Sequence, residues 1–218
     1  MSRTEALTDL AFIASSQRGY VTRAQAEAVG VEDNQLGRLT RSGVLVRVDH
    51  GVYRVAGAPE HPHERLWVAW LRLDPSRFVL DRHQDPHAWL SYAAAAAVWD
   101  LGELPDHEIE FIVDQRHQTS RSDVRFHRRS RGLDAEDWAI VEDLPVAKPH
   151  RVIADLAAAH VDGGHLARIV AEAVRHGHTD ANQLARALDP HAERYGFTTG
   201  TELAGYLLSV DNSMAVAA

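Results

Sequence analysis

The chain of 218 residues contains no cysteine. Disulfide bonds and thiolate metal sites are therefore excluded, and nothing in the sequence points to an oxidising compartment. The sequence also lacks a run of roughly 18 apolar residues, the length that a membrane-spanning helix needs. Its first residues lead into an amphipathic pattern instead of the apolar centre of a signal peptide. We therefore expect a cytoplasmic protein with no membrane partner.

The motifs of several common enzyme classes are missing as well. Residues 61–64 and 81–87 are rich in histidine and acids, but neither segment has the His-Glu-x-x-His spacing that places metal ligands on one helical face. Their prolines favour loops that carry surface histidines. Ser91 lacks the Gly-x-Ser-x-Gly turn of serine hydrolases, and no glycine-rich phosphate loop is present. We expect no catalytic residue, no cofactor and no metal site.

The first 57 residues show the pattern of a small helical domain. Residues 3–15 repeat apolar side chains at three- and four-residue spacings, which predicts an amphipathic helix. Thr22 precedes a second helical segment, residues 23–28, and Gln25 stands at the position that completes a capping box. Gly30 then favours the left-handed turn that ends this helix.

A third helix and a hairpin complete this domain. The helix is expected to open at Glu32 or Asp33 and run to about Ser42, with Leu36 and Leu39 facing inward. Two β-branched runs follow, residues 44–48 and 52–55, and Asp49-His50-Gly51 between them predicts a tight turn. Helix, turn, helix and hairpin in this order are typical of a winged helix-turn-helix, a DNA-binding module.

Polar groups of this module are candidates for DNA contacts. Amide and guanidinium groups read base edges in a major groove, and arginine also neutralises phosphates. Residues 1–57 carry a net charge of +1 in a chain of net charge −8, so one copy is expected to bind weakly, and a homodimer or help from the second domain is implied. The candidate DNA-binding residues are Thr22, Arg23, Asn34, Gln35, Arg38, Arg41, Arg47, His50 and Arg54.

Residues 19–26, 30–31, 39–45 and 47–54 together resemble the N-terminal domain of AbiEi-type antitoxins from bacterial type IV toxin-antitoxin systems. Residues 90–102 and 144–157 resemble two later segments of that family, although Tyr92 stands where many relatives have histidine. The resemblance implies a non-enzymatic autorepressor that binds an inverted-repeat operator. It also implies that the protein counters a nucleotidyltransferase-like toxin.

The remainder of the chain predicts a second domain. We expect a winged helix-turn-helix in residues 1–57, a linker in residues 58–65, where prolines disfavour regular structure, and a C-terminal antitoxin-like domain in residues 66–218. That domain starts with apolar helices at 66–71 and 89–98, continues with strands at 108–113 and 124–127, and is largely helical after Arg151. The predicted class is α+β, mainly helical with a small sheet.

A basic segment interrupts the acidic second domain. Residues 115–132 hold six arginines against a single acid, Asp123. Two interpretations stay open: a second contact to DNA phosphates or an acidic partner, and a solvated loop that pairs with neighbouring acids. The arginines are Arg116, Arg121, Arg125, Arg128, Arg129 and Arg131.

Two other functions are weighed against the repressor. A DNA-targeted nuclease would combine a DNA reader with acidic metal ligands, but Lys148, the only lysine, stands two residues after Val146 instead of after an acid. The winged helix is alternatively a module for protein–protein interaction, because this fold can keep its shape without a basic face.

Overall fold

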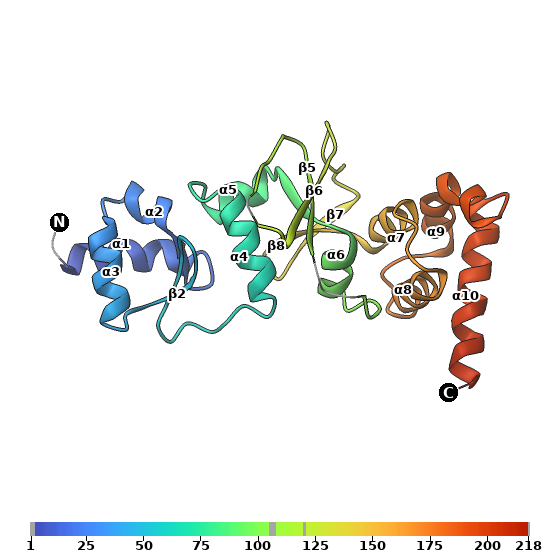
Figure 1. The fold of residues 1–218 in the computed structure, drawn as a ribbon, viewed down its shortest axis with the longest axis horizontal. Coiled ribbons are helices and arrows are strands. Elements are labelled where there is room, and N and C mark those ends of the chain that lie inside the picture. The colour runs from blue at the N-terminus through green and yellow to red at the C-terminus, as the bar shows by residue number, and fades with distance from the viewer. Residues whose placement is uncertain (1–2, 105–107, 120, 218) are drawn as a thin grey trace. The chain divides into compact units, whose positions relative to one another are not determined.

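The computed structural model describes residues 3–104, 108–119 and 121–217. The chain divides into two compact units, residues 1–87 and 88–218. Each unit has its own buried apolar residues. Figure 1 gives the order of helices and strands along the chain.

The first unit begins with α1 (Arg3–Ser15), α2 (Arg23–Ala28) and α3 (Asp33–Arg41). The predicted capping box on α2 is confirmed, because Thr22 Oγ1 accepts from Gln25 N at 3.1 Å and Gln25 Oε1 accepts from Thr22 N at 3.0 Å. Helix α3 has a second capping box, formed by Glu32 and Gln35. These reciprocal bonds satisfy backbone groups that would otherwise lack partners, so each helix has a defined start.

The wing belongs to a three-stranded antiparallel sheet in the order β1-β3-β2. The hairpin of β2 (Leu45–Asp49) and β3 (Val52–Val55) was predicted, and Gly51 adopts φ +71° in its turn. Strand β1 (Tyr20–Thr22) was not predicted, because a three-residue strand is too short to show a period of two.

Two further helices, α4 (Glu64–Leu73) and α5 (Val79–Gln84), also belong to the first unit. The boundary therefore differs from the predicted start of the second domain at residue 66. Contacts explain the difference: the Tyr20 hydroxyl donates to Glu64 at 2.6 Å, and the Tyr20 ring meets Trp67 edge-on at 6.2 Å between centroids. The expected linker is also packed, with His61 only 3% exposed and stacked on Trp67.

The second unit is built on a mixed five-stranded sheet in the order β6-β5-β4-β8-β7. Residues of β4 and β8 are buried along the whole of both strands. A helix was predicted at 89–98, but its first residues form β4 because they pair with both β5 and β8. The strands are β4 (Ala88–Leu90), β5 (Ile109–Val113), β6 (Val124–Arg128), β7 (Trp138–Val141) and β8 (Leu144–Ala147).

Helices accompany this sheet and continue beyond it in the chain. Helix α6 packs on β5 and on α7, and helix α10 packs on α8 and α9 (Figure 1). The predicted α+β class, with a mainly helical second part, is confirmed. The helices are α6 (Tyr92–Val98), α7 (Pro149–Ala158), α8 (Gly163–Arg175), α9 (Ala181–Leu188) and α10 (Gly200–Ala217), with short 3-10 turns at Asp189–His191 and Glu193–Tyr195.

Candidate nucleic-acid interface

Helix α3 separates an apolar face from a polar one. Leu36 and Leu39 are buried in the core of the winged helix, whereas Asn34, Arg38 and Arg41 are exposed. Arg38 lies beside Asn34, with 3.4 Å between its Nη2 and the Asn34 Oδ1. Among the described residues, no acidic side chain forms an ion pair with Arg38 or Arg41. The polar face of α3 thus presents two uncompensated guanidinium groups and an amide to solvent.

A second group of exposed basic side chains lies at the hairpin turn. Arg47 and His50 are both exposed, and Arg47 Nη2 lies 3.4 Å from His50 Nδ1. Arg47 Nε also donates to the Asp49 carbonyl at 3.3 Å. These short-range contacts restrict the Arg47 side chain without neutralising its charge, so it keeps the capacity to bind a phosphate.

Arg23, at the start of α2, is only partly available. Its guanidinium forms ion pairs with Glu27 at 2.8 Å and Asp33 at 2.5 Å, and about half of the side chain is exposed. The hydrogen bond to Glu27, with the nearby charge of Asp33, raises the pKa of Arg23. A phosphate at this position would compete with two carboxylates.

The remaining predicted DNA contacts are engaged within the first unit. Thr22 is fully buried, and its hydroxyl donates to the Pro75 carbonyl as well as capping α2. Gln35 accepts from Glu32 N at 2.8 Å. Arg54 is 13% exposed and donates to Ala58 O at 2.7 Å and to Glu60 at 2.8 Å. Thr22 and Arg54 thus bond to other segments of the first unit and Gln35 caps α3, while their contact with DNA stays a prediction.

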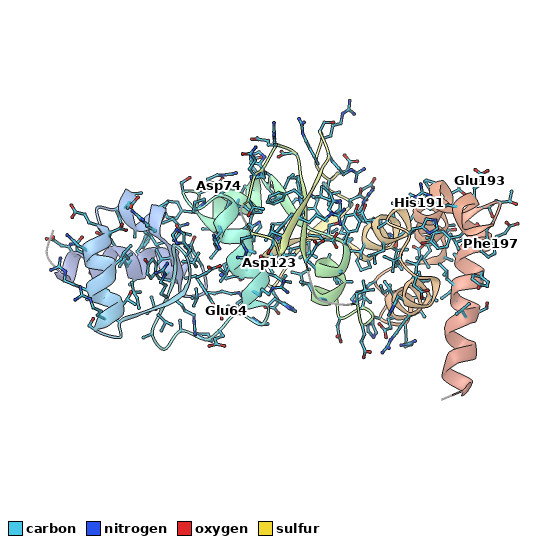
Figure 2. The ribbon with its side chains drawn as sticks, viewed as in Figure 1. Glu64, Asp74, Asp123, His191, Glu193 and Phe197 are labelled. Carbon is cyan, nitrogen blue, oxygen red and sulfur yellow. The ribbon has the colours of Figure 1, made fainter. Side chains whose placement is uncertain are left out.

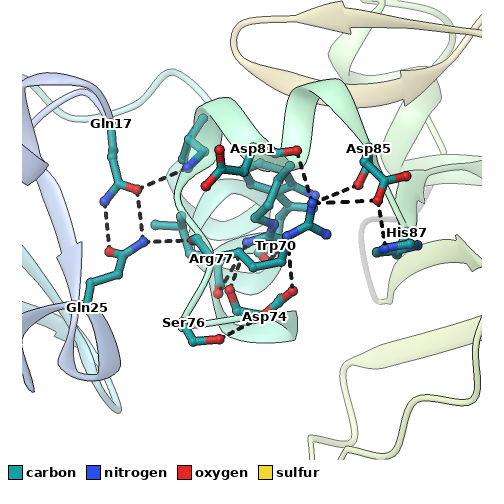
Figure 3. A network of polar contacts seen from close by, with 12 residues as sticks. Gln17, Gln25, Trp70, Asp74, Ser76, Arg77, Asp81, Asp85 and His87 are labelled. Carbon is teal, nitrogen blue, oxygen red and sulfur yellow. Dashed lines mark hydrogen bonds and ion pairs between the residues drawn. The ribbon is translucent and has the colours of Figure 1, made fainter. Parts of the chain in front are cut away.

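A buried pair of amides, which the sequence did not predict, positions α2. Gln17 and Gln25 donate to each other at 2.9 and 3.0 Å (Figure 3). Gln25 Nε2 also donates to the Arg77 carbonyl at 2.9 Å, and Gln17 Oε1 accepts from Val79 N at 3.3 Å. The pair therefore ties the start of the helix-turn-helix to residues 77–79, where α5 begins. Only the partners' positions in the fold reveal this role, because glutamine is usually exposed.

The basic segment of the second unit lies around β6, an edge strand of the sheet. Two of its arginines are paired: Arg121 binds both carboxylate oxygens of Asp123 (labelled in Figure 2) at 2.7 and 2.8 Å, and Arg125 lies 3.6 Å from Glu108. These two pairs are of the kind that the solvated-loop interpretation expects, and the second contact to DNA phosphates or to an acidic partner stays a prediction. The arginines that are exposed and form no ion pair within the described part of the chain are Arg116, Arg128, Arg129 and Arg131.

The two segments rich in histidine and acids, residues 61–64 and 81–87, were expected to be loops without a metal site. The segment predicted as a loop at 81–87 is helical in its first part, as α5. Over the residues that the structure describes, no group of three or more histidine or acidic side chains is arranged to hold a metal ion. No helix in the same residues is both long and apolar enough to cross a membrane.

Part of the first unit matches the sequence model of a known protein family. The model of a family described as "Transcriptional regulator, AbiEi antitoxin" matches residues 9–56, which run from α1 through the wing. The predicted AbiEi resemblance is confirmed. The match covers the helices and hairpin that carry the exposed polar groups of α3 and the turn. No curated protein matches the chain.

A solved structure resembles this chain in fold. The crystal structure of the RV2827C protein from Mycobacterium tuberculosis superimposes with a TM-score of 0.54 at 20% sequence identity. The alignment covers 95% of this chain and 77% of that one. At this identity the likeness concerns the fold alone, so it supports the arrangement of elements and adds nothing about ligands.

Proposed function

We propose that the protein represses transcription by binding operator DNA with the exposed face of α3. The observation that carries the proposal is the pair of uncompensated guanidinium groups, Arg38 and Arg41, beside Asn34 on a helix whose other face is buried. Such groups form bidentate hydrogen bonds to guanine and adenine edges. Helix α3 enters the major groove, and Arg47 and His50 bring the wing to the phosphate backbone.

The biological role proposed is that of an antitoxin that controls its own operon. The family match supports an antitoxin and regulator role in general. The specific form proposed is binding of an inverted repeat by a homodimer, with the protein countering a nucleotidyltransferase-like toxin. A dimer supplies twice the few phosphate contacts of one winged helix, which a module of net charge +1 needs at physiological salt.

The test compares DNA binding by the Arg38→Ala and Arg41→Ala variants with that of the wild type. Each variant is expected to bind a fragment of its own promoter more weakly. If the arginine neutralises a phosphate, the slope of log affinity against log salt falls by about one unit in its variant. Arg175→Ala, which changes an exposed arginine on α8, is the matched control and should bind as the wild type does.

Three outcomes contradict this function. Unchanged binding by both α3 variants would remove α3 from the interface, and no binding by the wild type would favour a winged helix used for protein–protein contact. Cleavage of the fragment in the presence of magnesium, abolished by acid-to-alanine changes in the second unit, would favour a nuclease. Retardation of the fragment without cleavage is the expected result.

A further inference from the structure

Two segments that are far apart in the sequence meet inside the second unit. Ser91 follows β4, and its hydroxyl donates to Asp155 Oδ2 on α7 at 3.0 Å. Both residues are buried, Ser91 fully and Asp155 to 3% exposure. Arg151 donates to the same carboxylate through Nε at 3.0 Å and through Nη2. Residues 64 positions apart thus form one hydrogen-bonded group.

This group fixes Arg151 in a definite position. Burying an ion pair costs desolvation energy, and apolar residues of similar volume often stabilise a core as well or better. The bonds to Asp155 hold one edge of the guanidinium, while 21% of the side chain stays accessible. A cation that is held by a buried carboxylate and still reaches the surface is suited to receive an anion.

Arg151 lines a cavity of about 350 Å³. That volume lies within the roughly 300–1,000 Å³ range of small-molecule sites. His150 also lines the cavity, and its Nε2 lies 3.1 Å from Asp137 Oδ1. The polar lining residues are Glu136, Asp137, His150, Arg151, Gln183 and Arg186.

The charges of the lining indicate what kind of ligand fits. Arg186 is exposed and forms no ion pair with any described residue, so its guanidinium has free donors for an oxyanion. Glu136 and Asp137, which also line the cavity, would repel a polyanion such as DNA. The same two acids accept hydrogen bonds from a donor group. The mixed lining favours a small molecule with an anionic end and a hydrogen-bond-donating end.

We propose that this cavity binds a small organic anion, whose oxyanion is held by Arg151 and Arg186 and whose donor groups face Glu136 and Asp137. A phosphate ester and an amino-acid carboxylate share this chemistry. The site is separate from the proposed DNA contacts on α3 and the wing. In this site the carboxylate of Asp155 orients Arg151, and the exposed Arg186 is the second cation.

Isothermal titration of the full chain tests this site with three probes: inorganic phosphate, adenosine monophosphate and glutamate. At least one probe is expected to bind, and Arg186→Ala is expected to weaken it about tenfold or more, which corresponds to the loss of a charge-assisted contact. Because Arg186 is exposed, the unfolding temperature of the variant should match that of the wild type. Arg175→Ala, which changes an exposed arginine of α8 that does not line the cavity, is the control and should leave affinity unchanged.

A second variant tests the proposed contact between Glu136 and the donor groups of the ligand. Glu136→Gln is expected to weaken binding of glutamate or the nucleotide, which carry donor groups, more than binding of inorganic phosphate. A nucleotide preference identifies the ligand as a phosphate ester, and a glutamate preference identifies it as a carboxylate. The proposal is overturned if none of the probes binds, or if binding in Arg186→Ala equals that of the wild type.

Discussion

Arg82 shows how one buried cation can hold two helices together. It is 4% exposed and donates to the carbonyls of Trp70 at 2.6 Å and Leu71 at 3.4 Å, near the end of α4. Its guanidinium carbon also lies 3.6 Å from the centre of a Trp70 ring. Carbonyls at a helix end lack partners within the helix and carry a partial negative charge. Arg82, from α5, therefore satisfies the end of α4, although burial lowers its pKa to about 9.

Replacing Arg82 with methionine is expected to destabilise the protein by about 2–4 kcal/mol, because buried carbonyls lose their donors while the side-chain volume is largely kept. Urea denaturation measures the free energy of unfolding. Arg41→Ala, an exposed change in the same unit, is the control and should cost less than about 0.5 kcal/mol. Equal stability of the Arg82 variant and the wild type would mean that water or other donors replace the guanidinium.

Tyr20 gives the first unit a dependence on alkaline pH. Its hydroxyl donates to Glu64 at 2.6 Å and accepts from His61 N at 3.0 Å. Burial, and then the hydrogen bond to Glu64, raise the pKa of Tyr20 from 10.0 to about 12. A raised folded-state pKa means that the neutral phenol is favoured in the folded state. This contribution is complete below pH 10 and is lost as pH rises from 10 towards 12.

The Tyr20→Phe variant should therefore lose less stability than the wild type between pH 10 and pH 12. At neutral pH it should be less stable by about 1–2 kcal/mol, because Glu64 and His61 lose a hydrogen-bond partner. Denaturation at a series of pH values measures both effects, and subtracting the two curves removes the titration of the other tyrosines. Parallel curves above pH 10 would show that Tyr20 ionises alike in the folded and unfolded chains.

At the scale of elements, α4 and α5 complete the winged helix. The Gln17–Gln25 pair has backbone partners at Arg77 and Val79, and Thr22 has one at Pro75. A chain cut after residue 57 would leave these buried polar groups without partners and would expose the Tyr20 ring. Such groups cost about 1–3 kcal/mol each when left unsatisfied.

Fragment 1–87 is accordingly expected to unfold in one cooperative thermal transition, whereas fragment 1–57 should show a weaker transition or none. Circular dichroism during heating distinguishes the two. Fragment 1–57 with Gln17→Leu and Gln25→Leu tests the cause, since removing the amides removes the unsatisfied groups and should restore part of the stability. Equal transitions for 1–57 and 1–87 would show that the winged helix folds independently of α4 and α5.

The distance along the chain between contacting residues explains which features the sequence could predict. Helices α2 and α3 and the hairpin follow from capping residues, the spacing of Leu36 and Leu39, and the glycine turn, all of which act within a few residues. The exposure of Arg38 and Arg41 follows from that spacing. The burial of Thr22 does not, because its partner Pro75 lies 53 positions away. Strand β4 was predicted as helix for a similar reason: its apolar residues fit either structure until their pairing with β5 and β8 is known.

At the scale of the whole molecule, charge is distributed unevenly. Residues 1–57 are net +1, and the rest of the chain accounts for the excess acid in a total of −8. This acidic remainder opposes DNA binding through long-range repulsion, which salt screens. Four exposed arginines around β6, Arg116, Arg128, Arg129 and Arg131, are the exception, and they have no acidic partner among the described residues. If they touch DNA, the contact is to phosphates and is independent of base sequence.

Changing Arg116, Arg128, Arg129 and Arg131 together to alanine distinguishes this second contact from a solvated surface. If the four arginines touch phosphates, affinity should fall by a similar factor for operator and unrelated DNA, and the salt slope should decrease by about one unit for each phosphate that is no longer neutralised. Fluorescence anisotropy at several salt concentrations measures both. The Arg38→Ala variant provides the contrast, because removing a hydrogen bond to a base should reduce operator binding more than binding of unrelated DNA. Unchanged affinity and slope in the fourfold variant would assign these arginines to solvent, leaving α3 and the wing as the proposed DNA-binding surface.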